Sequence, residues 1–316
     1  MLKGKAVVIT GAGRGIGAAC ARGAGRQGAL VVVNDIDEEE AAATAHAIVA
    51  EGGTAIACAG DVSNWDDAGR LVETCLAAFG KIDGLVNNAA LYHIGGVEAL
   101  DPAISRALVE VNVLGPIHCT GHAVKPMLAQ GSGSIVNVVS GAHMGMRGMS
   151  IYGATKGAVA SMVYTWALEL EGSGVRVNAL SPFGATDILE NSARQLEKRY
   201  GVEAKAMGHP TSSVQIQPPE ANSPVVEYLL SDAAAGINGQ LIRIDSGELQ
   251  LYTHPALLLP SVRRDSWDAS AVAQAFTDDL AHRQVKCGVL GMETLPVALN
   301  SGHWKRNEQA QDGSGD

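Results

Sequence analysis

Short apolar runs alternate with longer segments of mixed polarity along most of the chain. The apolar runs, rich in Val, Ile, Leu and Ala, cover residues 5–10, 29–35, 54–62, 82–90, 133–140, 175–181 and 239–245. The segments between them have helical character at 17–28, 38–52, 66–80, 102–130 and 150–171. Strands that are apolar along their whole length and alternate with helices are typical of a parallel sheet covered on both faces. The pattern predicts an α/β fold, with a doubly wound parallel seven-stranded sheet in a single domain.

The chain continues well beyond the last predicted strand. We assign residues 1–248 to the predicted domain and residues 249–316 to a C-terminal extension. Within the extension, "WDASAVAQAFTDDLAHR" predicts an amphipathic helix with one apolar stripe, formed by Val272, Ala275, Phe276 and Leu280. We expect the extension to pack on the domain or on a neighbouring subunit, with a mobile polar end at "QAQDGSGD".

Composition and charge argue against several classes of protein. Hydrophobic residues make up 47% of the chain, enough for a sizeable core, and the net charge is −10. A nucleic-acid-binding protein normally has a basic face, and no cluster of Lys and Arg is visible. No apolar run reaches the ~18 residues of a membrane helix, and "MLKGKAVVIT" predicts a first strand rather than a signal peptide. The five cysteines are scattered without a CxxC spacing, which predicts reduced thiols, no metal site and a cytoplasmic location.

A glycine-rich turn lies between the first predicted strand and the first predicted helix. In "TGAGRGIG", Gly11, Gly15 and Gly17 let the backbone approach a pyrophosphate, and Arg14 and Ile16 lie between them. The N-terminus of the helix supplies N–H groups and positive potential for the phosphates. In this context the motif predicts a dinucleotide-binding site.

Further cofactor contacts are predicted at the ends of the next three strands. Asp35 ends the second strand, where an acidic residue can hold both ribose hydroxyls of an adenosine. Asp61 and Val62 follow the third strand, at a position where an adenine ring can lie. Asn88 and Ala89 belong to "NNAA" at the end of the fourth strand, where small side chains leave room for a cofactor.

The choice between NAD and NADP depends on two residues of opposite charge. Arg14 is a cation near the predicted adenosine ribose and favours the 2′-phosphate of NADP. The carboxylate of Asp35 repels that phosphate and accepts charge-assisted hydrogen bonds from the ribose hydroxyls of NAD. Because Asp35 is held by its strand whereas Arg14 lies on a turn, the predicted cofactor is NAD.

The segment "SIYGATKGAV" places a phenol and an ammonium group one helical turn apart, at Tyr152 and Lys156. One interpretation is a solvated helix surface. The other is chemical, because a cation about 5 Å away at an effective dielectric constant of about 20 favours ionisation of a phenol by ~3 kcal/mol, roughly 2 pKa units. Lys156 and an oxidised nicotinamide would together make Tyr152 a base near neutral pH.

Taken together, these motifs resemble those of the short-chain dehydrogenase/reductase family: "TGAGRGIG", "NNAA", Asn112 in "VNVLG", Ser140 at the end of the fifth predicted strand, and "YGATK". The resemblance covers residues 3–247 and implies a Rossmann-type domain that interconverts a secondary alcohol and a ketone with a nicotinamide cofactor. It implies that Tyr152 is the catalytic base, that Ser140 binds the substrate oxygen and that Lys156 also binds the nicotinamide ribose. Asn112 would hold a water that links Lys156 to solvent. A homo-oligomer, tetramer or dimer, is implied as well.

Three features depart from the usual family pattern. Ser140 and Tyr152 are one residue closer together than usual, a difference that the intervening loop can absorb. In "SPFGATDI", Phe183 is interposed, so the threonine that usually contacts the nicotinamide amide comes one place early. We still predict cofactor contacts from this segment, at Pro182, Gly184 and Thr186. The sequence does not determine which group binds the nicotinamide amide, or what role the long C-terminal extension has.

The substrate pocket is predicted from two segments at the same edge of the sheet. Residues 141–149 lie between the predicted catalytic serine and tyrosine, and residues 91–96 follow "NNAA". The candidate pocket residues in them are Tyr92, His93, His143, Met144 and Met149. Methionines in so short a loop favour a bulky, mostly apolar substrate, whereas each histidine has both a substrate-binding and a purely structural interpretation. The polar stretch from 186 to 224 is expected to hold a mobile substrate loop.

The sequence therefore predicts an NAD-dependent secondary-alcohol dehydrogenase for a small molecule such as a steroid, terpenoid, cyclic alcohol or dihydrodiol. A 3-oxoacyl thioester reductase with a preference for NADPH and an acyl-carrier partner is an alternative. A non-catalytic dinucleotide-binding regulatory protein is another, although the presence of both Tyr152 and Lys156 argues against it. The natural substrate and the physiological direction of the reaction are not determined by the sequence.

Overall fold

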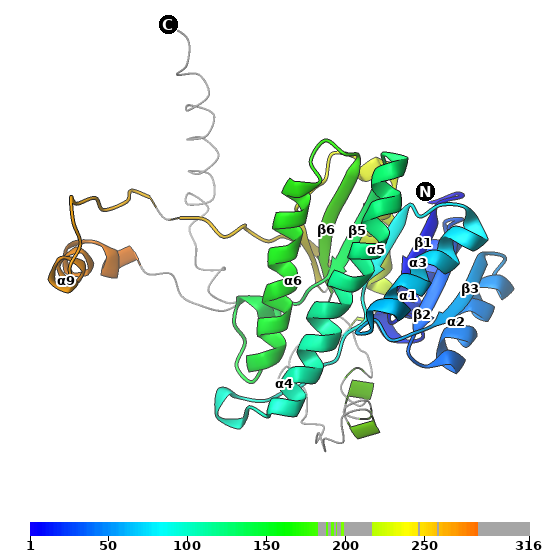
Figure 1. Ribbon diagram of the computed structural model, residues 1–316, viewed down its shortest axis with the longest axis horizontal. Coiled ribbons are helices and arrows are strands. Elements are labelled where there is room, and N and C mark those ends of the chain that lie inside the picture. Colours follow the sequence, from blue (N-terminus) through cyan, green and yellow to red (C-terminus); the bar gives the residue numbers. More distant parts are fainter. Residues whose placement is uncertain are drawn as a thin grey trace, which may run out of the picture. The chain divides into compact units, whose positions relative to one another are not determined.

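A computed structural model describes residues 1–182, 188, 191–192, 194, 197–198, 217–245, 247–257 and 259–283 (Figure 1). Contacts divide the chain into two units, Met1–Tyr252 and Thr253–Asp316. The described part of the second unit contains α9 (Ala269–Asp278) and the short 3-10 helix η6 (Leu280–Arg283). In α9, Ala275 is buried while Val272 and Phe276 are exposed.

The first unit is built around an eight-stranded sheet with the order β3-β2-β1-β4-β5-β6-β7-β8. Its strands are β1 (Ala6–Ile9), β2 (Leu30–Asp35), β3 (Thr54–Ala59), β4 (Gly84–Asn87), β5 (Gly133–Val138), β6 (Val175–Ser181), β7 (Leu241–Asp245) and β8 (Glu248–Leu251). The first seven are parallel, and β8 is antiparallel to β7. The predicted doubly wound α/β fold is confirmed.

The predicted number of seven strands is wrong by one, because the sheet continues into β8. All four residues of β8 are exposed, and Leu249 and Leu251 are exposed by 67% and 63%. An exposed edge strand lacks the continuous buried apolar run by which the parallel strands are recognised in a sequence. Most of β8, which the sequence analysis placed in the C-terminal extension, therefore belongs to the sheet.

Helices follow the parallel strands in the order that the hydrophobic pattern predicts. Their bounds are α1 (Gly15–Arg26), α2 (Glu38–Ala50), α3 (Trp65–Phe79), α4 (Pro102–Val109), α5 (Gly115–Gln130), α6 (Ser150–Glu169) and α8 (Ser223–Leu230). α1 packs against α2 and α8, α3 packs against α5, and α6 packs against α4. Figure 1 shows α4, α5 and α6 side by side over β5 and β6. The eight-residue α8 lies in a stretch that the sequence pattern left without a predicted element.

The predicted helix from 102 to 130 is continuous but contains a wider turn. Asp101 caps its start by accepting hydrogen bonds from the N–H groups of Ala103 (2.8 Å) and Ile104 (3.0 Å), and it ends at Gly131 with φ 67°. Between α4 and α5 the chain forms a π-helical turn, η2 (Glu110–Leu114). Such turns are frequent at functional sites, and this one contains Asn112.

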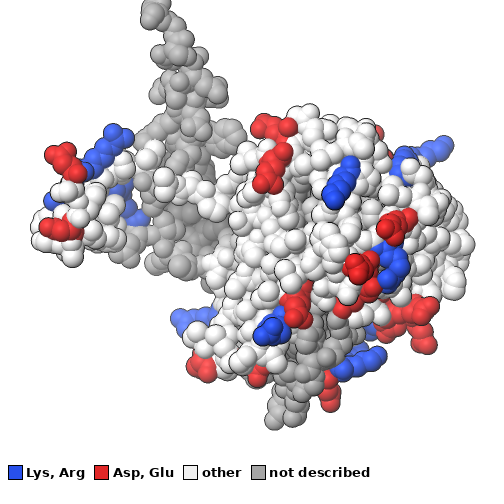
Figure 2. Space-filling model, viewed as in Figure 1, with Lys and Arg blue, Asp and Glu red and all other residues white. Residues whose placement is uncertain are grey.

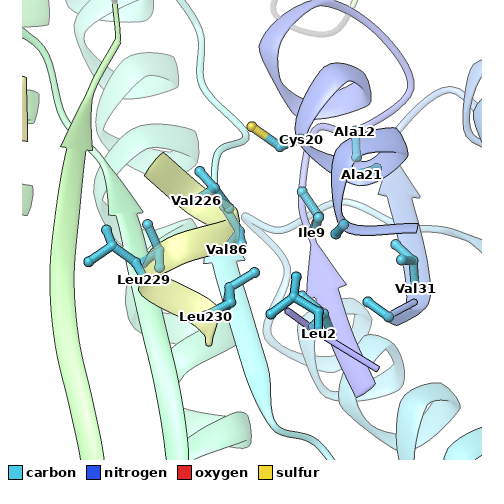
Figure 3. Close-up of a cluster of buried hydrophobic side chains, with 14 of the residues drawn as sticks. Leu2, Ile9, Ala12, Cys20, Ala21, Val31, Val86, Val226, Leu229 and Leu230 are labelled. Carbon is cyan, nitrogen blue, oxygen red and sulfur yellow. The ribbon is translucent and has the colours of Figure 1, made fainter. Parts of the chain in front are cut away.

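A cluster of buried apolar side chains holds α1 and α8 against the sheet. Figure 3 shows Leu2, Ile9 and Val31 on one side of it and Val226, Leu229 and Leu230 of α8 on the other. Cys20 lies in the same cluster, and burial raises the pKa of its thiol to about 12. The cysteines in the described part of the chain are all free thiols.

No helix among the described residues is both long and apolar enough to cross a membrane. Their His, Cys, Asp and Glu side chains form no group that could hold a metal ion.

Candidate active site

The glycine turn between β1 and α1 has the geometry of a phosphate-binding site. Gly11 and Gly15 have φ angles of 58° and 57°, in the left-handed region that favours glycine. A Cβ on Gly17 would lie 2.1 Å from the carbonyl oxygen of Gly11, and one on Gly11 would lie 2.7 Å from Cα of Ala89. At the N-cap of α1, Arg14 makes no side-chain capping bond. The first N–H groups of the helix therefore lack a side-chain cap, and this arrangement fits a pyrophosphate.

Asp35 lies at the carboxyl end of β2 beside this turn and is 8% exposed. One of its carboxylate oxygens accepts the N–H of Gly13 at 3.0 Å, and the other accepts the N–H of Asp37 at 3.1 Å. Each oxygen keeps a lone pair for a further hydrogen bond. The carboxylate is thus held in place with acceptor capacity left for a ribose hydroxyl.

The guanidinium group of Arg14 pairs with acidic side chains. Its Nη2 atom lies 3.2 Å from Oδ2 of Asp37 and 3.7 Å from Oε1 of Glu40. Its Nη1 atom donates to Oδ1 of Asn191 at 3.2 Å. These contacts, which the sequence reasoning missed, neutralise much of the positive charge that would favour a 2′-phosphate.

The other predicted residues at this end pack around the glycine turn. Asn88 donates through Nδ2 to the carbonyl oxygens of Thr10 (2.9 Å) and Gly11 (2.8 Å), so its side chain supports the glycine turn. Ala89 donates its N–H to Thr10 Oγ1 at 3.1 Å. Ile16 is partly buried and packs against the apolar core.

Asp61 and Val62 lie in the turn after β3. One carboxylate oxygen of Asp61 accepts hydrogen bonds from the backbone N–H of Ser63 (3.0 Å) and from its hydroxyl (2.8 Å). The side chain of Val62 is 5% exposed, and a Cβ on Gly115 would come within 2.8 Å of it. The turn therefore has a fixed shape next to the start of α5.

The phenol of Tyr152 and the ammonium group of Lys156 lie next to each other on α6, and both are buried, with exposed fractions of 6% and 3%. This burial excludes the interpretation of the pair as a solvated helix surface. Lys156 Nζ lies 5.8 Å from the centre of the Tyr152 ring and donates to the carbonyl oxygen of Val138 at 2.8 Å. Burial lowers the pKa of Lys156 to about 8.

Ser140 follows β5 and faces the same phenol. Burial, together with the neighbouring Tyr92, raises the pKa of Tyr152 above its ordinary value, and a hydrogen bond with the Ser140 side chain lowers it. The shorter spacing between Ser140 and Tyr152 therefore does not keep the two side chains apart. The positive charge of Lys156 favours the phenolate form of Tyr152, and burial of the phenol opposes it.

Asn112 is fully engaged by neighbouring parts of the protein. Its side chain exchanges two hydrogen bonds with the backbone of Leu91, at 2.7 and 2.8 Å, and donates to Thr155 Oγ1 at 3.1 Å. Thr155 Oγ1 in turn donates to the carbonyl oxygen of Tyr152 at 2.8 Å. The π-helical turn thus ties the segment after β4 to the helix that carries Tyr152. The water relay through Asn112 stays a prediction.

Two of the predicted pocket residues pack next to these groups. The rings of Tyr92 and Tyr152 are 4.6 Å apart at an interplanar angle of 66°, and burial raises the pKa of Tyr92 to about 12. The N–H of Tyr92 also donates to Ser192 Oγ at 2.8 Å, a contact that no sequence pattern indicated. Met149 is buried and forms a β-bridge with Gly95. The two predicted pocket segments are thereby joined.

His143 lies one turn beyond Ser140, in the short 3-10 helix η3 (Gly141–Met144). Its Nδ1 atom lies 2.5 Å from the carbonyl oxygen of Ser140, and its ring lies 4.9 Å from that of Tyr252. Burial lowers the pKa values of both His143 and His93. Met144, in the same helix, is half-buried. The sequence reasoning did not single out Tyr252, which follows an exposed strand.

The segment after β6 is described only in part. Pro182 is half-buried directly after β6. Phe183 and the predicted cofactor residues Gly184 and Thr186 lie outside the described residues, as does the stretch 199–216 of the predicted substrate loop.

Comparison with known proteins assigns this fold and site to a family. The sequence profile of the short chain dehydrogenase family matches residues 5–197. A 3-oxoacyl-[acyl-carrier-protein] reductase of Synechocystis sp. is 36% identical over 250 residues, which are 78% of this chain and 97% of that protein. A cis-4-hydroxycyclohexanecarboxylate dehydrogenase of Sinomonas cyclohexanicum is 35% identical over 246 residues, which are 77% of this chain and 96% of that protein.

A short chain dehydrogenase of Mycobacterium avium has a similar crystal structure, with a TM-score of 0.74 and 28% sequence identity. The match covers 89% of this chain and 95% of that one. The chain belongs to the short-chain dehydrogenase/reductase family. It is accordingly an oxidoreductase of the class that binds a nicotinamide dinucleotide.

Proposed function

We propose that this protein interconverts a secondary alcohol and a ketone by hydride transfer with NAD(H), and that its substrate is a bulky, mostly apolar cyclic alcohol. The observation that carries the proposal is the buried Tyr152–Lys156 pair on α6, with the Ser140 side chain close enough to the phenol to lower its pKa. A buried phenol next to a buried ammonium group has little structural benefit, because each loses its hydration. Such a pair is typical of a site that moves a proton.

Each side chain has a distinct part in the reaction. A bound nicotinamide dinucleotide supplies the hydride acceptor for alcohol oxidation and the hydride donor for ketone reduction. In oxidation the Tyr152 phenolate accepts the proton of the substrate hydroxyl, and in reduction the phenol returns it. The Ser140 hydroxyl donates a hydrogen bond to the substrate oxygen and stabilises the developing alkoxide. Lys156 uses one N–H for Val138 and keeps two for the ribose and the phenol.

The preference for NAD is supported by the charges beside the glycine turn. Asp35 is held by two backbone N–H groups, and Asp37 and Glu40 lie next to Arg14. A 2′-phosphate placed here would meet several carboxylates and a guanidinium that is already paired. The ribose hydroxyls of NAD instead find an oriented acceptor in Asp35.

A mostly apolar substrate is supported by the side chains near the catalytic group. Tyr92 is buried with its ring against that of Tyr152. Met149 is buried at the end of the segment 141–149, and Met144 in the same segment is half-buried. Burial lowers the pKa values of His93 and His143, so both imidazoles are mainly neutral at neutral pH. The similarity to a dehydrogenase of a hydroxycyclohexane carboxylate supports a ring-shaped alcohol.

A 3-oxoacyl thioester reductase is the second candidate, favoured by the 36% identity to the Synechocystis sp. protein. Acyl carrier proteins are acidic, and the net charge of −10 on this chain gives no general attraction for an acidic partner. The carboxylates around Arg14 also disfavour NADPH. A third candidate, a non-catalytic dinucleotide-binding protein, predicts binding without turnover.

Turnover assays with a panel of substrates separate these candidates. The purified protein is assayed with NAD and NADP against cyclic alcohols, steroids, terpenoid alcohols, dihydrodiols and 3-hydroxyacyl thioesters, and in the reverse direction with the ketones. We expect the highest kcat/KM with NAD and a cyclic alcohol. A thioester with NADPH as the best pair would favour the reductase. Cofactor binding without turnover on any substrate would favour the regulatory protein.

We also infer that the protein is cytoplasmic and forms a homo-oligomer through the face formed by α4, α5 and α6. Apolar side chains on and next to these helices are exposed, namely Val109, Leu114, Ile117, Leu128 and Leu168. Figure 2 shows a large area of this face without charged residues. Light scattering of the purified protein is expected to give the mass of a dimer or a tetramer, and a monomeric mass at micromolar concentration would contradict this.

A further inference from the structure

Tyr252 reaches the active site from the far edge of the sheet. It follows β8, and its N–H donates to the carbonyl oxygen of Leu241 at 3.0 Å. Its hydroxyl lies 3.0 Å from Ser181 Oγ at the end of β6, and the side chain is 6% exposed. Because β7 lies between β8 and β6, the side chain crosses one strand to make this contact.

The ring of Tyr252 also contacts the turn that carries Ser140. It meets the ring of His143 edge to face, at 4.9 Å and 71°, a favoured arrangement for two aromatic rings. His143 lies 2.5 Å from the carbonyl oxygen of Ser140 through Nδ1. A carbonyl oxygen only accepts, so Nδ1 carries the proton and Nε2 of the neutral ring is an acceptor. The imidazole is therefore fixed on one side by Ser140 and on another by Tyr252.

We propose that Tyr252 is a positioning and specificity-determining residue of the active site, which fixes the His143 ring beside Ser140 and joins it to the end of β6 through Ser181. The proposal rests on the proposed function, because it assigns a wall of the same substrate site. Ser140 binds the substrate oxygen, and Ser181 immediately precedes the segment predicted to contact the nicotinamide. A residue that contacts Ser181 directly and Ser140 through His143 sets the width of the space between them.

This role is one that β8 makes possible. The hairpin pairs Ile242 with Leu251 and so places the next residue, Tyr252, beside Leu241 of β7, from where its side chain reaches Ser181 at the end of β6. Tyr252 is buried although every residue of β8 is exposed. Its side chain, unlike those of β8, contacts both Ser181 and His143.

Two replacements at position 252 distinguish the role of the Tyr252 hydroxyl from that of its ring. Tyr252→Phe removes only the contact with Ser181, whereas Tyr252→Leu also removes the contact with His143. The probes are cyclohexanol and the larger 2-decalol, each with NAD. We expect Tyr252→Leu to change the ratio of kcat/KM for these alcohols by at least tenfold in favour of 2-decalol, mainly through KM, and Tyr252→Phe to change it by less than threefold. Tyr228→Leu on α8 is the control, and we expect it to leave the ratio unchanged.

A double-mutant cycle tests whether Tyr252 acts through His143. In a His143→Leu background, Tyr252→Leu should change the ratio by less than threefold, because the ring that it positions is absent. The selectivity ratio is independent of the fraction of folded enzyme, so a loss of stability alone would not move it. Additive effects of the two replacements, or an unchanged ratio in Tyr252→Leu, would overturn the proposal.

A measurement on the free protein distinguishes failure of this proposal from failure of the proposed function. In 15N-labelled protein we expect His143 to show the signature of an Nδ1–H tautomer, and its ring-proton signals to shift in Tyr252→Leu but not in Tyr228→Leu. If wild-type protein turned over no secondary alcohol while these shifts were observed, the proposed function would fail and the positioning of His143 would stand. If the wild-type protein turned over a secondary alcohol and the shifts were absent, the proposed function would stand and the positioning of His143 by Tyr252 would fail.

Discussion

The two ends of the candidate active site hold their polar groups in different ways. At the β1–β2 end, Arg14 pairs with Asp37 and Glu40, and all three side chains are partly exposed. At the β5–β6 end, Tyr152 and Lys156 are buried, Tyr152 against the ring of Tyr92 and Lys156 against the carbonyl oxygen of Val138. The pKa values of the second pair are clearly displaced from their ordinary values.

The difference shows where binding and chemistry are separated in this molecule. Solvent screens the partly exposed charges of Arg14, Asp37 and Glu40, so we expect them to act mainly on which ligand binds. Dehydration at the buried end raises the free energy of the charged forms, so small changes in neighbouring charge can move a proton. A change at the first end should alter which cofactor binds, and a change at the second should alter the reaction and its dependence on pH.

The largest expected effect is that of Tyr152→Phe, at the buried end. It removes the hydroxyl that we propose exchanges a proton with the substrate, and kcat should fall by about a thousandfold, while NADH binding, measured by fluorescence, stays within threefold. Tyr164→Phe on the same helix is the matched control and should retain kcat. Turnover above about a tenth of the wild-type value in Tyr152→Phe would remove the basis for assigning Tyr152 as the base.

Lys156→Met should change how stability depends on pH. The folded protein releases the Lys156 proton at about pH 8, whereas the unfolded chain keeps it up to the ordinary pKa of 10.5. Between these values the unfolded state binds more protons, so Lys156 makes wild-type stability rise with pH. The gap of 10.5 − 8 = 2.5 units corresponds to about 3 kcal/mol.

The expected result is that Lys156→Met gains stability relative to wild type at pH 7 and loses most of that advantage by pH 10.5. The buried cysteines are present in both proteins, so their contributions cancel in the difference. Urea unfolding at a series of pH values measures it, with the exposed Lys125→Met as control. Parallel stability curves for Lys156→Met and wild type would show that Lys156 is not dehydrated in the folded state.

Two truncations test whether the buried end depends on β8. A chain ending at Gly247 lacks β8 and Tyr252, whereas a chain ending at Tyr252 keeps both. We expect the shorter chain to be less stable than the longer one by about 2 kcal/mol, since it loses a buried aromatic side chain, and to have a higher KM. Thermal unfolding of both is the measurement. If the chain ending at Tyr252 unfolded like the full-length protein, the predicted docking of the extension would be refuted.

The smallest expected effect is at the β1–β2 end. Asp35→Ser removes the carboxylate that we propose accepts the ribose hydroxyls, and the ratio of kcat/KM for NAD over NADP should fall about tenfold, or by about 1.4 kcal/mol. The exposed Asp66→Ser on α3 is the control. A wild-type enzyme that used NADPH as well as NADH would show that Asp35 does not face the ribose. In the Asp35→Ser background, we expect the further change Arg14→Ala to reduce the use of NADP.

Local patterns were sufficient for the glycine turn at the β1–β2 end. The strand, glycine turn and helix are consecutive in the chain, so their spacing alone predicts the turn that Gly11, Gly15 and Gly17 form. The pairing of Arg14 with Asp37 and Glu40 was missed, because 23 and 26 residues separate Arg14 from them in the sequence. Predicted roles for Asn88 and Asn112 were incomplete, because the sequence does not show which backbone groups a side-chain amide will meet.

The sequence by itself determined the parallel sheet, because continuous runs of Val, Ile and Leu are stable only where both faces are covered. It also determined that Tyr152 and Lys156 share one face of a helix, because 3.6 residues per turn fix that geometry. Only the tertiary structure decided that this face is buried, that β8 extends the sheet and that Tyr252 lies against His143. Burial and long-range contacts depend on which surfaces meet after folding, and no local period in the chain encodes that.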